Sequence, residues 1–429
     1  MSRVLRIELR RSAALGTALI LLVIGTISLY FAEGIEFASG WMQLAMSQRL
    51  YLALLWPLAL AAGAWQSSRE HRSKVGELFA STPRPRAHRM VPTLGAMAIA
   101  VVCGYLAMGI AGGLWIIGTA RYFPVSVFVV TAVGALALIA AAWLGQAIGR
   151  LLPSLVTAPA LGVAGLALLL LIPGATRPRG WLALVFSPIY EMNMPGAYAT
   201  VPGRASLSQA IWLAALATTA VLLLASGGWR LRVAAVLPVV LGATLAIAIM
   251  PRDNRYVTDA VDQAAMALVC ADDEPRVCVS RVHSGLLADV TSPARQGLTI
   301  LAKLPGAPTQ VHEDTTTYPD VYPVWHDDVA LVRIVTGESV TAADVVSAAF
   351  QTPPQCDRPT ASADSLAAAY WLIGTQPVAS DSPDLAEAVA RWEALRAAPA
   401  AEAQAQVVAL RTAALTCTTD SNILSRSAR

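Results

Sequence analysis

The stretch RVLRIELRRSAALGTALILLVIGTISLYF, residues 3–31, decides the class of fold. Its second part, residues 12–31, is apolar over about the 20 residues that an α-helix needs to cross the hydrocarbon core of a bilayer. Four arginines precede it: Arg3, Arg6, Arg10 and Arg11. A basic start before an apolar run is also typical of a signal peptide, but this run is too long and lacks a small-residue cleavage site. We therefore predict a first membrane span that is retained.

The rest of the chain extends this pattern. Of its 429 residues, 56% are hydrophobic and only 14% are charged, whereas about a quarter of the residues in a soluble domain are charged. Six further apolar runs are long enough to be spans, at residues 50–65, 91–119, 125–148, 155–173, 207–225 and 233–250. The fold class predicted is a polytopic α-helical membrane protein of six or seven transmembrane helices, with a transmembrane domain over residues 1–250.

The charge distribution divides the chain after residue 250. Residues 1–250 carry 18 basic and 6 acidic side chains, whereas residues 251–429 carry 13 basic and 22 acidic ones. The two parts therefore have net charges of +12 and −9. This asymmetry predicts two domains in two environments, and nothing in it requires nucleic acid as a partner.

The basic residues of the short loops predict the orientation. If the N-terminus is cytoplasmic, the cytoplasmic segments hold thirteen basic residues and the outer loops hold five. The five are Arg49, Arg121, Arg177, Arg179 and Arg204. Cytoplasmic loops are enriched in Lys and Arg, so a cytoplasmic N-terminus is favoured, and seven spans then place residues 251–429 outside the cell membrane. No charged residue lies inside the seven runs, which argues against a carrier driven by protons or sodium ions.

Cysteine placement agrees with an outer domain over residues 251–429. Cys103 lies alone in the third span, where a small packing residue is expected. The other four cysteines are Cys270, Cys278, Cys356 and Cys417. An even set in an extracytoplasmic domain predicts two disulfides with three possible pairings, of which we favour Cys270 with Cys278 and Cys356 with Cys417. A four-cysteine zinc site is the rival interpretation, but no CxxC spacing is present.

The outer domain is predicted to be a helix-rich α/β domain. Residues 277–282 and 329–335 have strand patterns, and residues 284–303, 384–398 and 400–415 have helical spacing, with Pro399 between the last two. Thr341 and Asp344 form a capping-box pattern that opens a helix through Phe350.

Three histidines are candidates for metal chemistry in this domain. His312 is followed by Glu313, but position 316 is Thr, so the HExxH motif fails. A metal site of His312, His326, Asp327 and Asp328 stays open beside the simpler interpretation of these residues as solvated loop residues. A GxSxG elbow is missing, and we predict no catalytic, cofactor or metal residue in the chain.

The loop SSREHRSKVGELFASTPRPRAHRM, residues 67–90, carries eight Arg, Lys or Glu side chains. Burying them in lipid would cost on the order of 20 kcal/mol, so the loop must lie in water. Charges that fix topology are one explanation of it. Its middle, residues 73–80, also has the pattern of a short amphipathic helix, which Pro83 ends. Such a helix between two spans is suited to docking in a groove of a cytoplasmic partner.

At these residues the chain resembles the permease subunits of type-2 ABC exporters. The resemblance rests on RVLRIELRRS, on REHRSKVGELFASTPRPR and on WLALVFSPIYEMNMP. The permeases carry an R-E-x-x-(S/T)-x-x-E-L-x-x-(S/T)-(S/T)-P-like pattern in this loop. Its matches here are Arg69, Glu70, Ser73 or Lys74, Glu77, Leu78, Ser81, Thr82 and Pro83, whereas the family's loop glycine is displaced to Gly76. The resemblance covers most of residues 1–250, and over the tail it is weaker.

The resemblance implies a role for each segment. Residues 2–11 would be an interfacial elbow helix with Arg3, Arg6, Arg10 and Arg11 facing lipid headgroups. The interface with the ATPase would comprise Ser73, Lys74, Glu77, Leu78, Phe79, Ser81, Thr82 and Pro83. Residues 181–194 would be half-membrane external helices, although an ordinary outer loop explains them nearly as well.

The resemblance also implies the partners. The chain has no GxxxxGK(S/T) loop, so ATP and Mg²⁺ would bind a separate ATPase subunit, and a second permease copy or a sister permease would complete the pathway in the bilayer. Export rather than import is inferred from the family. The alternative is a membrane-anchored receptor or enzyme whose outer domain carries the activity, with a metallopeptidase tail as a more remote version.

Overall fold

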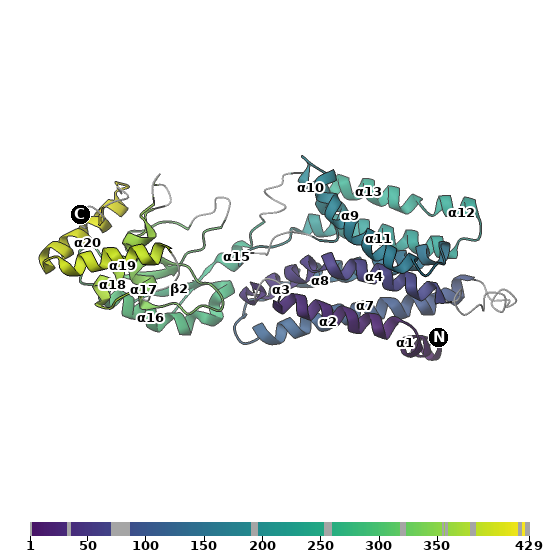
Figure 1. Cartoon of the computed structure of the whole chain (residues 1–429), viewed down its shortest axis with the longest axis horizontal. Helices are drawn as coiled ribbons and strands as arrows, with labels where there is room; N and C mark the ends of the chain where they lie inside the picture. Colours follow the sequence, from purple (N-terminus) through teal and green to yellow (C-terminus); the bar gives the residue numbers. More distant parts are fainter. Residues whose placement is uncertain are drawn as a thin grey trace. The chain divides into compact units, whose positions relative to one another are not determined.

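The computed structural model describes residues 2–31, 36–69, 86–189, 196–252, 260–317, 323–353, 356, 359–377, 383–418 and 423–424. They divide into two compact units (Figure 1). Unit 1 comprises Met1–Gly118 and Phe123–Asp262, and unit 2 comprises Thr119–Tyr122 and Gln263–Arg429. Unit 1 extends past residue 250 because residues 260–262 hydrogen-bond to residues 198–200, with Thr200 N donating to Ala260 O at 2.9 Å and Asp262 N donating to Tyr198 O at 2.9 Å.

Unit 1 is a bundle of helices, and its long members run side by side in Figure 1. They are α1 (Ser2–Arg11), α2 (Ala14–Phe31), η1 (Glu36–Ser39), α3 (Trp41–Leu50), α4 (Leu52–Ser67), α7 (Arg86–Ile116), α8 (Ser126–Leu151), α9 (Thr157–Ala175), α10 (Gly180–Phe186), α11 (Gly203–Ala225), α12 (Trp229–Ala234) and α13 (Leu237–Ile249). Among the described residues, six stretches are long and apolar enough to cross a membrane, and α3 with α4, bent by 51°, makes a seventh if the pair counts as one span. The prediction of a multi-pass helical membrane protein is confirmed.

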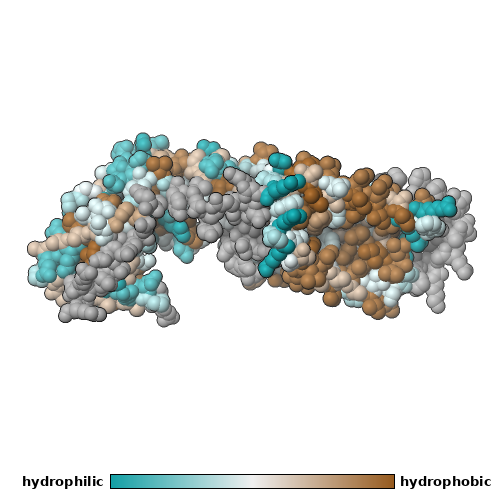
Figure 2. Space-filling model, turned by 90° about the horizontal axis from the view of Figure 1, so that it is seen from above, coloured by the Kyte–Doolittle hydropathy of each residue, from teal (hydrophilic) through white to brown (hydrophobic). Residues whose placement is uncertain are grey.

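The outward surface of unit 1 is apolar, as expected for helices in lipid. Large hydrophobic side chains are exposed along α2, α7, α8, α9 and α13, and hydrophobic residues cover the face of unit 1 that Figure 2 shows. Because hydrocarbon is the solvent for such a surface, exposed leucines and valines there cost no stability. Cys103 is exposed on α7, so the expectation that it packs inside the bundle is wrong.

Small residues allow α4 and α8 to pack at backbone contact. On α8, Ala141, Gly145 and Gly149 recur every four positions, so they lie on one face of the helix. A Cβ atom on Gly145 would overlap the carbonyl of Leu60, and one on Gly63 would overlap the carbonyl of Ala142. Small residues at such spacing are typical of helix pairs in membranes, where close van der Waals packing drives association.

Unit 2 contains a four-stranded sheet in the order β1-β2-β3-β4. The strands are β1 (Leu268–Cys270), β2 (Val277–Ser280), β3 (Gln310–Glu313) and β4 (Val329–Val332); β1 pairs antiparallel with β2, and the other two pairs are parallel. The helices are α15 (Gln263–Met266), η2 (Arg281–Leu286), α16 (Leu287–Leu301), α17 (Ala342–Ala348), α18 (Ser362–Ile373), α19 (Pro383–Ala397) and α20 (Ala400–Leu415). One hydrophobic core, which includes Val277, Leu301, Phe350 and Trp392, joins sheet and helices.

Several local predictions for unit 2 are confirmed. Thr341 caps α17 in a capping box: Asp344 N donates to Thr341 Oγ1, and Thr341 N donates to Asp344 Oδ2. Pro399 is the N-cap of α20, as its place between two helical patterns indicates. The predicted strand at 277–282 ends at Ser280, because η2 begins at Arg281 and turns the chain into α16.

Both disulfides lie in unit 2. Cys270 is bonded to Cys278, its direct cross-strand partner in β1 and β2, and Cys356 is bonded to Cys417, 61 residues away. These are the two pairs that the sequence favours. Disulfides persist in oxidising compartments, so they indicate an extracytoplasmic location for unit 2.

Candidate functional site

The helix α3 carries a run of polar residues into the interior of unit 1. Gln43, Ser47, Gln48 and Arg49 are each no more than 3% exposed, and every residue from 42 to 49 is buried. Buried polar groups are costly unless they are hydrogen-bonded. The partners of these side chains therefore show what α3 holds in place. We call Gln43, Gln48, Arg49 and Gln209 the polar cluster of unit 1.

Arg49 lies at the end of α3, next to the bend into α4, and is fully buried. Its Nη2 donates to the backbone oxygen of Pro188 at 2.9 Å and to Gln209 Oε1 at 2.9 Å. Gln209, also fully buried on α11, donates through Nε2 to Leu184 O at 2.7 Å. Arg49 and Gln209 thus join α3, α11 and the chain that leaves α10. The sequence placed Arg49 among the charges of an outer loop, and this is wrong.

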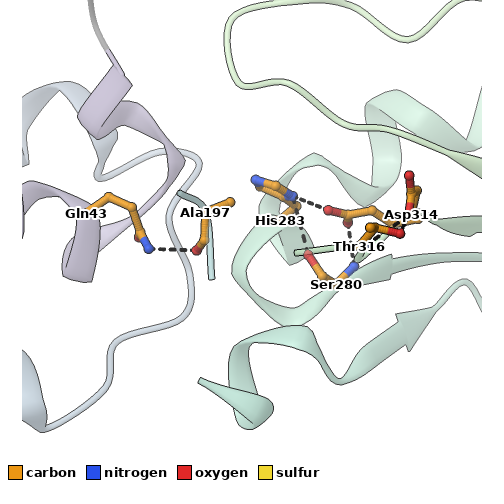
Figure 3. Close-up of polar contacts among 7 residues, drawn as sticks. Gln43, Ala197, Ser280, His283, Asp314 and Thr316 are labelled. Carbon is orange, nitrogen blue, oxygen red and sulfur yellow. Dashed lines mark hydrogen bonds and ion pairs between the residues drawn. The ribbon is translucent and has the colours of Figure 1, made fainter. Parts of the chain in front are cut away.

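Gln43 holds a second non-helical segment. Its Nε2 donates to Ala197 O at 2.6 Å (Figure 3) and to Gly196 O at 3.1 Å. These carbonyls precede α11, and the next residues, 198–200, pair with residues 260–262. Gly196 O also accepts from Ala199 N at 3.0 Å. Because buried backbone carbonyls need hydrogen-bond donors, the amide of Gln43 helps to hold this segment.

Gln48 ties the same helix to α7. Its Nε2 donates to Tyr105 O at 3.0 Å, and its amide lies against Gly109, where a Cβ atom would come within 2.8 Å of Gln48 Nε2. Through Gln43, Gln48 and Arg49, α3 is therefore fixed to α7, to α11 and to the segments on both sides of residues 190–195.

This cluster offers a permanent positive charge and hydrogen-bond donors, and it has no group suited to proton transfer. Away from their terminal turns, the described spans contain one charged side chain, Arg49. A guanidinium is not deprotonated in proteins, so it cannot take up and release a proton during a transport cycle. An ionisable side chain at membrane depth is a candidate functional group by default, and here it also sets the position of three chain segments.

The described part of residues 181–194 is buried or half-buried. Leu184 and Val185 of α10 lie in the same hydrophobic core as Met42 and Met46 of α3, and Ser187, Pro188 and Ile189 after the helix are buried too. The segment is thus a seven-residue helix packed into unit 1 and not a solvated loop; residues 190–194 lie outside the described residues. Whether it is half of a membrane re-entrant pair stays a prediction.

The other predicted sites are placed as follows. The eight residues of the predicted ATPase interface, from Ser73 to Pro83, lie outside the described residues. Arg3, Arg6, Arg10 and Arg11 fall on α1, which is helical as predicted; their contact with lipid headgroups stays a prediction.

Unit 2 contains a buried group that the sequence did not indicate. His283 Nδ1 lies 2.5 Å from Glu313 Oε1 and 3.3 Å from Ser280 Oγ, and Ser280 N donates to Glu313 Oε2 at 2.6 Å (Figure 3). A Ser-His-acid triad uses one ring nitrogen for each partner, whereas here both contacts fall on Nδ1. With all three residues at most 3% exposed, the group is a structural connection between β2, η2 and β3 and not a hydrolytic site.

The candidate metal ligands do not converge. Among the described residues of unit 2, no three His, Cys, Asp or Glu side chains are placed to hold an ion. Asp328 Oδ2 accepts from Gln310 Nε2 at 3.2 Å, and Asp327 Oδ1 accepts from Trp325 Nε1 at 3.1 Å. Burial lowers the pKa of His312, and the nearby charges of Arg276 and His326 lower it further, against the opposing effect of Asp328.

Comparisons of the chain with protein-family models, with curated proteins and with solved structures find no match. The function must therefore be argued from the residues of this chain alone.

Proposed function

We propose that the chain is the membrane-spanning permease subunit of an ATP-binding cassette transporter of the export type. The observation that carries the proposal is the order of residues in the loop between α4, which ends at Ser67, and α7, which begins at Arg86. This loop joins two membrane-spanning segments at one end of the bundle and has the pattern of a docking helix with a built-in stop. A helix attached to two spans would transmit the movement of an ATPase to the bundle.

The described spans support an energy source on another polypeptide. Ion-coupled carriers bind and release their ion at ionisable groups within the membrane. Away from the terminal turns of the described spans, the charged side chain is that of Arg49, which is fully buried and keeps its proton. ATP and Mg²⁺ would bind the partner ATPase, and this chain would form the pathway with a second copy or a sister permease.

The proposed orientation keeps the N-terminus in the cytoplasm. With Arg49 counted as buried, the loops hold thirteen basic residues on the proposed cytoplasmic side and four on the other. This orientation places unit 2, with its two disulfides, outside the cell membrane, in the oxidising environment that disulfides need.

The test is copurification of an ATPase with the tagged full chain from its native membranes. Glu77→Ala with Leu78→Ala removes the acidic and apolar groups of the proposed docking helix, so bound ATPase and ATP hydrolysis should both be lost. Arg84→Gln with Arg86→Gln is the matched control, since it alters charge in the same loop outside residues 73–83. The proposal fails if the first pair retains ATPase and hydrolysis at the level of the control.

A further inference from the structure

A long groove runs along the surface of unit 1 between α3, α7 and α8. Its volume is about 720 Å³, within the range of about 300–1,000 Å³ typical of small-molecule sites. Its lining includes Trp41 and Gln48 of α3 and Ala132 and Ala135 of α8. We propose that this groove holds one acyl chain of a membrane phospholipid. The inference does not depend on coupling to an ATPase.

The lining of the groove is uncharged, as a site for hydrocarbon requires. The residues that line the groove carry no charged side chain, and their polar groups are the amide of Gln48, the hydroxyl of Thr131 and the indole of Trp41. The Gln48 amide donates to Tyr105 O, within the protein. A polar cargo or a charged headgroup would find almost no hydrogen-bond partner here, whereas an alkyl chain needs none.

Small residues line the groove on two helices. Gly109 and Gly113 lie one helical turn apart on α7. A Cβ atom on Gly113 would stand 3.0 Å from the ring of Trp41, and one on Gly109 would stand 2.8 Å from the Gln48 amide, so the glycines let these two side chains of α3 pack closely against α7. On α8 the short side chains of Ala132 and Ala135 line the groove and leave room for a narrow occupant.

The length of the groove fits an acyl chain of a lipid in one leaflet. Its lining residues on α7 extend from Val102 to Leu114, which corresponds to about 18 Å at 1.5 Å per residue. A leaflet contributes about half of the 30 Å hydrocarbon core, or about 15 Å. The groove is therefore long enough to take the whole depth of a leaflet along its axis.

Aromatic rings mark the end at which a headgroup would lie. The ring centroid of Phe123 is 5.4 Å from that of Trp41 and 5.2 Å from that of Phe128. All three residues line the groove where α7 ends and α8 begins. Tryptophan is enriched at the level of the lipid headgroups. A chain that enters beside these rings and runs toward the middle of α7 has the direction of a lipid in the bilayer.

The first experiment maps where lipid contacts the full chain. The protein is reconstituted in phosphatidylcholine vesicles that contain a trace of the same lipid with a photoreactive diazirine on one acyl chain. After irradiation, mass spectrometry should find labelling of residues 102–117 and 123–139 about tenfold above that of α9, although α9 is the more exposed helix, if chain release from the groove is slower by the same factor. Labelling spread evenly over the exposed helices would overturn the proposal.

Two variants then separate the groove from the general lipid surface. Ala132→Phe with Ala135→Phe fills the groove and should lower its labelling about tenfold, whereas Ala164→Phe, at an exposed alanine of α9, should leave it unchanged. Equal labelling in both variants would refute the proposal. So would an efficient disulfide between two chains carrying Ala132→Cys, because it would show that a second copy occupies the groove. If the filled variant does not fold, the distribution of label in the unaltered chain decides.

Discussion

The closest backbone approach in unit 1, between α4 and α8, allows a sharp prediction about stability. We predict that Gly145→Ala destabilises the bundle although alanine is the better helix former. A Cβ atom on Gly145 would stand 2.9 Å from the carbonyl carbon of Leu60 and would overlap its oxygen. Backbone atoms cannot rotate away as a side chain can, so the two helices must separate.

The size of the effect follows from two opposing contributions. Replacing a helical glycine by alanine gains roughly 0.5–1 kcal/mol, whereas overpacking a well-packed interface costs about 1–3 kcal/mol. The net loss for Gly145→Ala should be about 1–2 kcal/mol. Gly63→Ala meets the carbonyl of Ala142 across the same crossing, so one separation of the helices relieves both overlaps. The double variant should therefore lose less than the sum of the two single losses, by about 0.5–1 kcal/mol.

Thermal unfolding of the detergent-solubilised full chain, followed by loss of the monodisperse peak in size-exclusion chromatography, measures these differences. Gly16→Ala on α2 is the matched control, because no atom lies within 4 Å of its Cβ position; it should be neutral or stabilising. The reasoning is refuted if Gly145→Ala and Gly16→Ala unfold at the same temperature, since the crossing would then not be at backbone contact.

Three further predictions concern buried groups. Arg49→Met leaves the oxygens of Pro188 and Gln209 without their donor. It should lower the stability of the bundle by about 2–5 kcal/mol in the same assay, and Arg49→Lys should lower it by less. Equal losses of stability in the two variants would mean that the double hydrogen bond is unimportant. Removing Cys356–Cys417, which closes a separation of 61 residues, should destabilise unit 2 by about 4 kcal/mol, and removing Cys270–Cys278, with a separation of 8, by about 2–3 kcal/mol. Hydrogen exchange of unit 2 in the full chain measures both losses. A larger loss from removing Cys270–Cys278 than from removing Cys356–Cys417 would contradict the chain-entropy explanation. Because burial lowers the pKa of His312, the unfolded chain binds its proton at higher pH than the folded chain does. Stability of unit 2 should fall as the pH drops from about 6.5 toward the folded pKa, and His312→Gln should remove that slope; an unchanged slope would assign it to another group.

The membrane spans were predictable because their signal is local. An apolar run of about 20 residues needs no partner to be recognised, and α2, α7, α8, α9 and α11 lie close to the predicted runs. The helix α3 was missed because its ten residues include two glutamines, a serine and an arginine, a composition typical of a loop. What buries this helix is distant: Gln209 is 160 residues from Arg49, and Ala197 is 154 residues from Gln43.

In unit 2, too, the sequence predicted only elements with a local pattern. The helix α17 was predicted through its capping box, which lies within four residues of sequence, and Pro399 marked the start of α20. The strands β2 and β4, of four residues each, are fully buried and show as apolar runs. The strand β3 has the same length but only half of its residues are buried, and β1 has only three residues, so neither stands out as an apolar run. Glu313 was considered only for the motif that follows His312, whereas its partner is His283, 30 residues earlier. No local pattern identifies such a pair.

Arg49 lies inside the bundle and not in an outer loop, but a buried arginine still does not favour a carrier driven by protons. The predicted spans contained no charged residue, and the structure places one within the bent span of α3 and α4. A carrier driven by protons needs a group that is protonated in one state and not in another, as carboxylates and histidines can be. A guanidinium held by a backbone oxygen and an amide oxygen has no such second state. Arg49 therefore adds a fixed positive charge and a set of hydrogen bonds to the bundle, which agrees with the proposal that a separate ATPase supplies the energy.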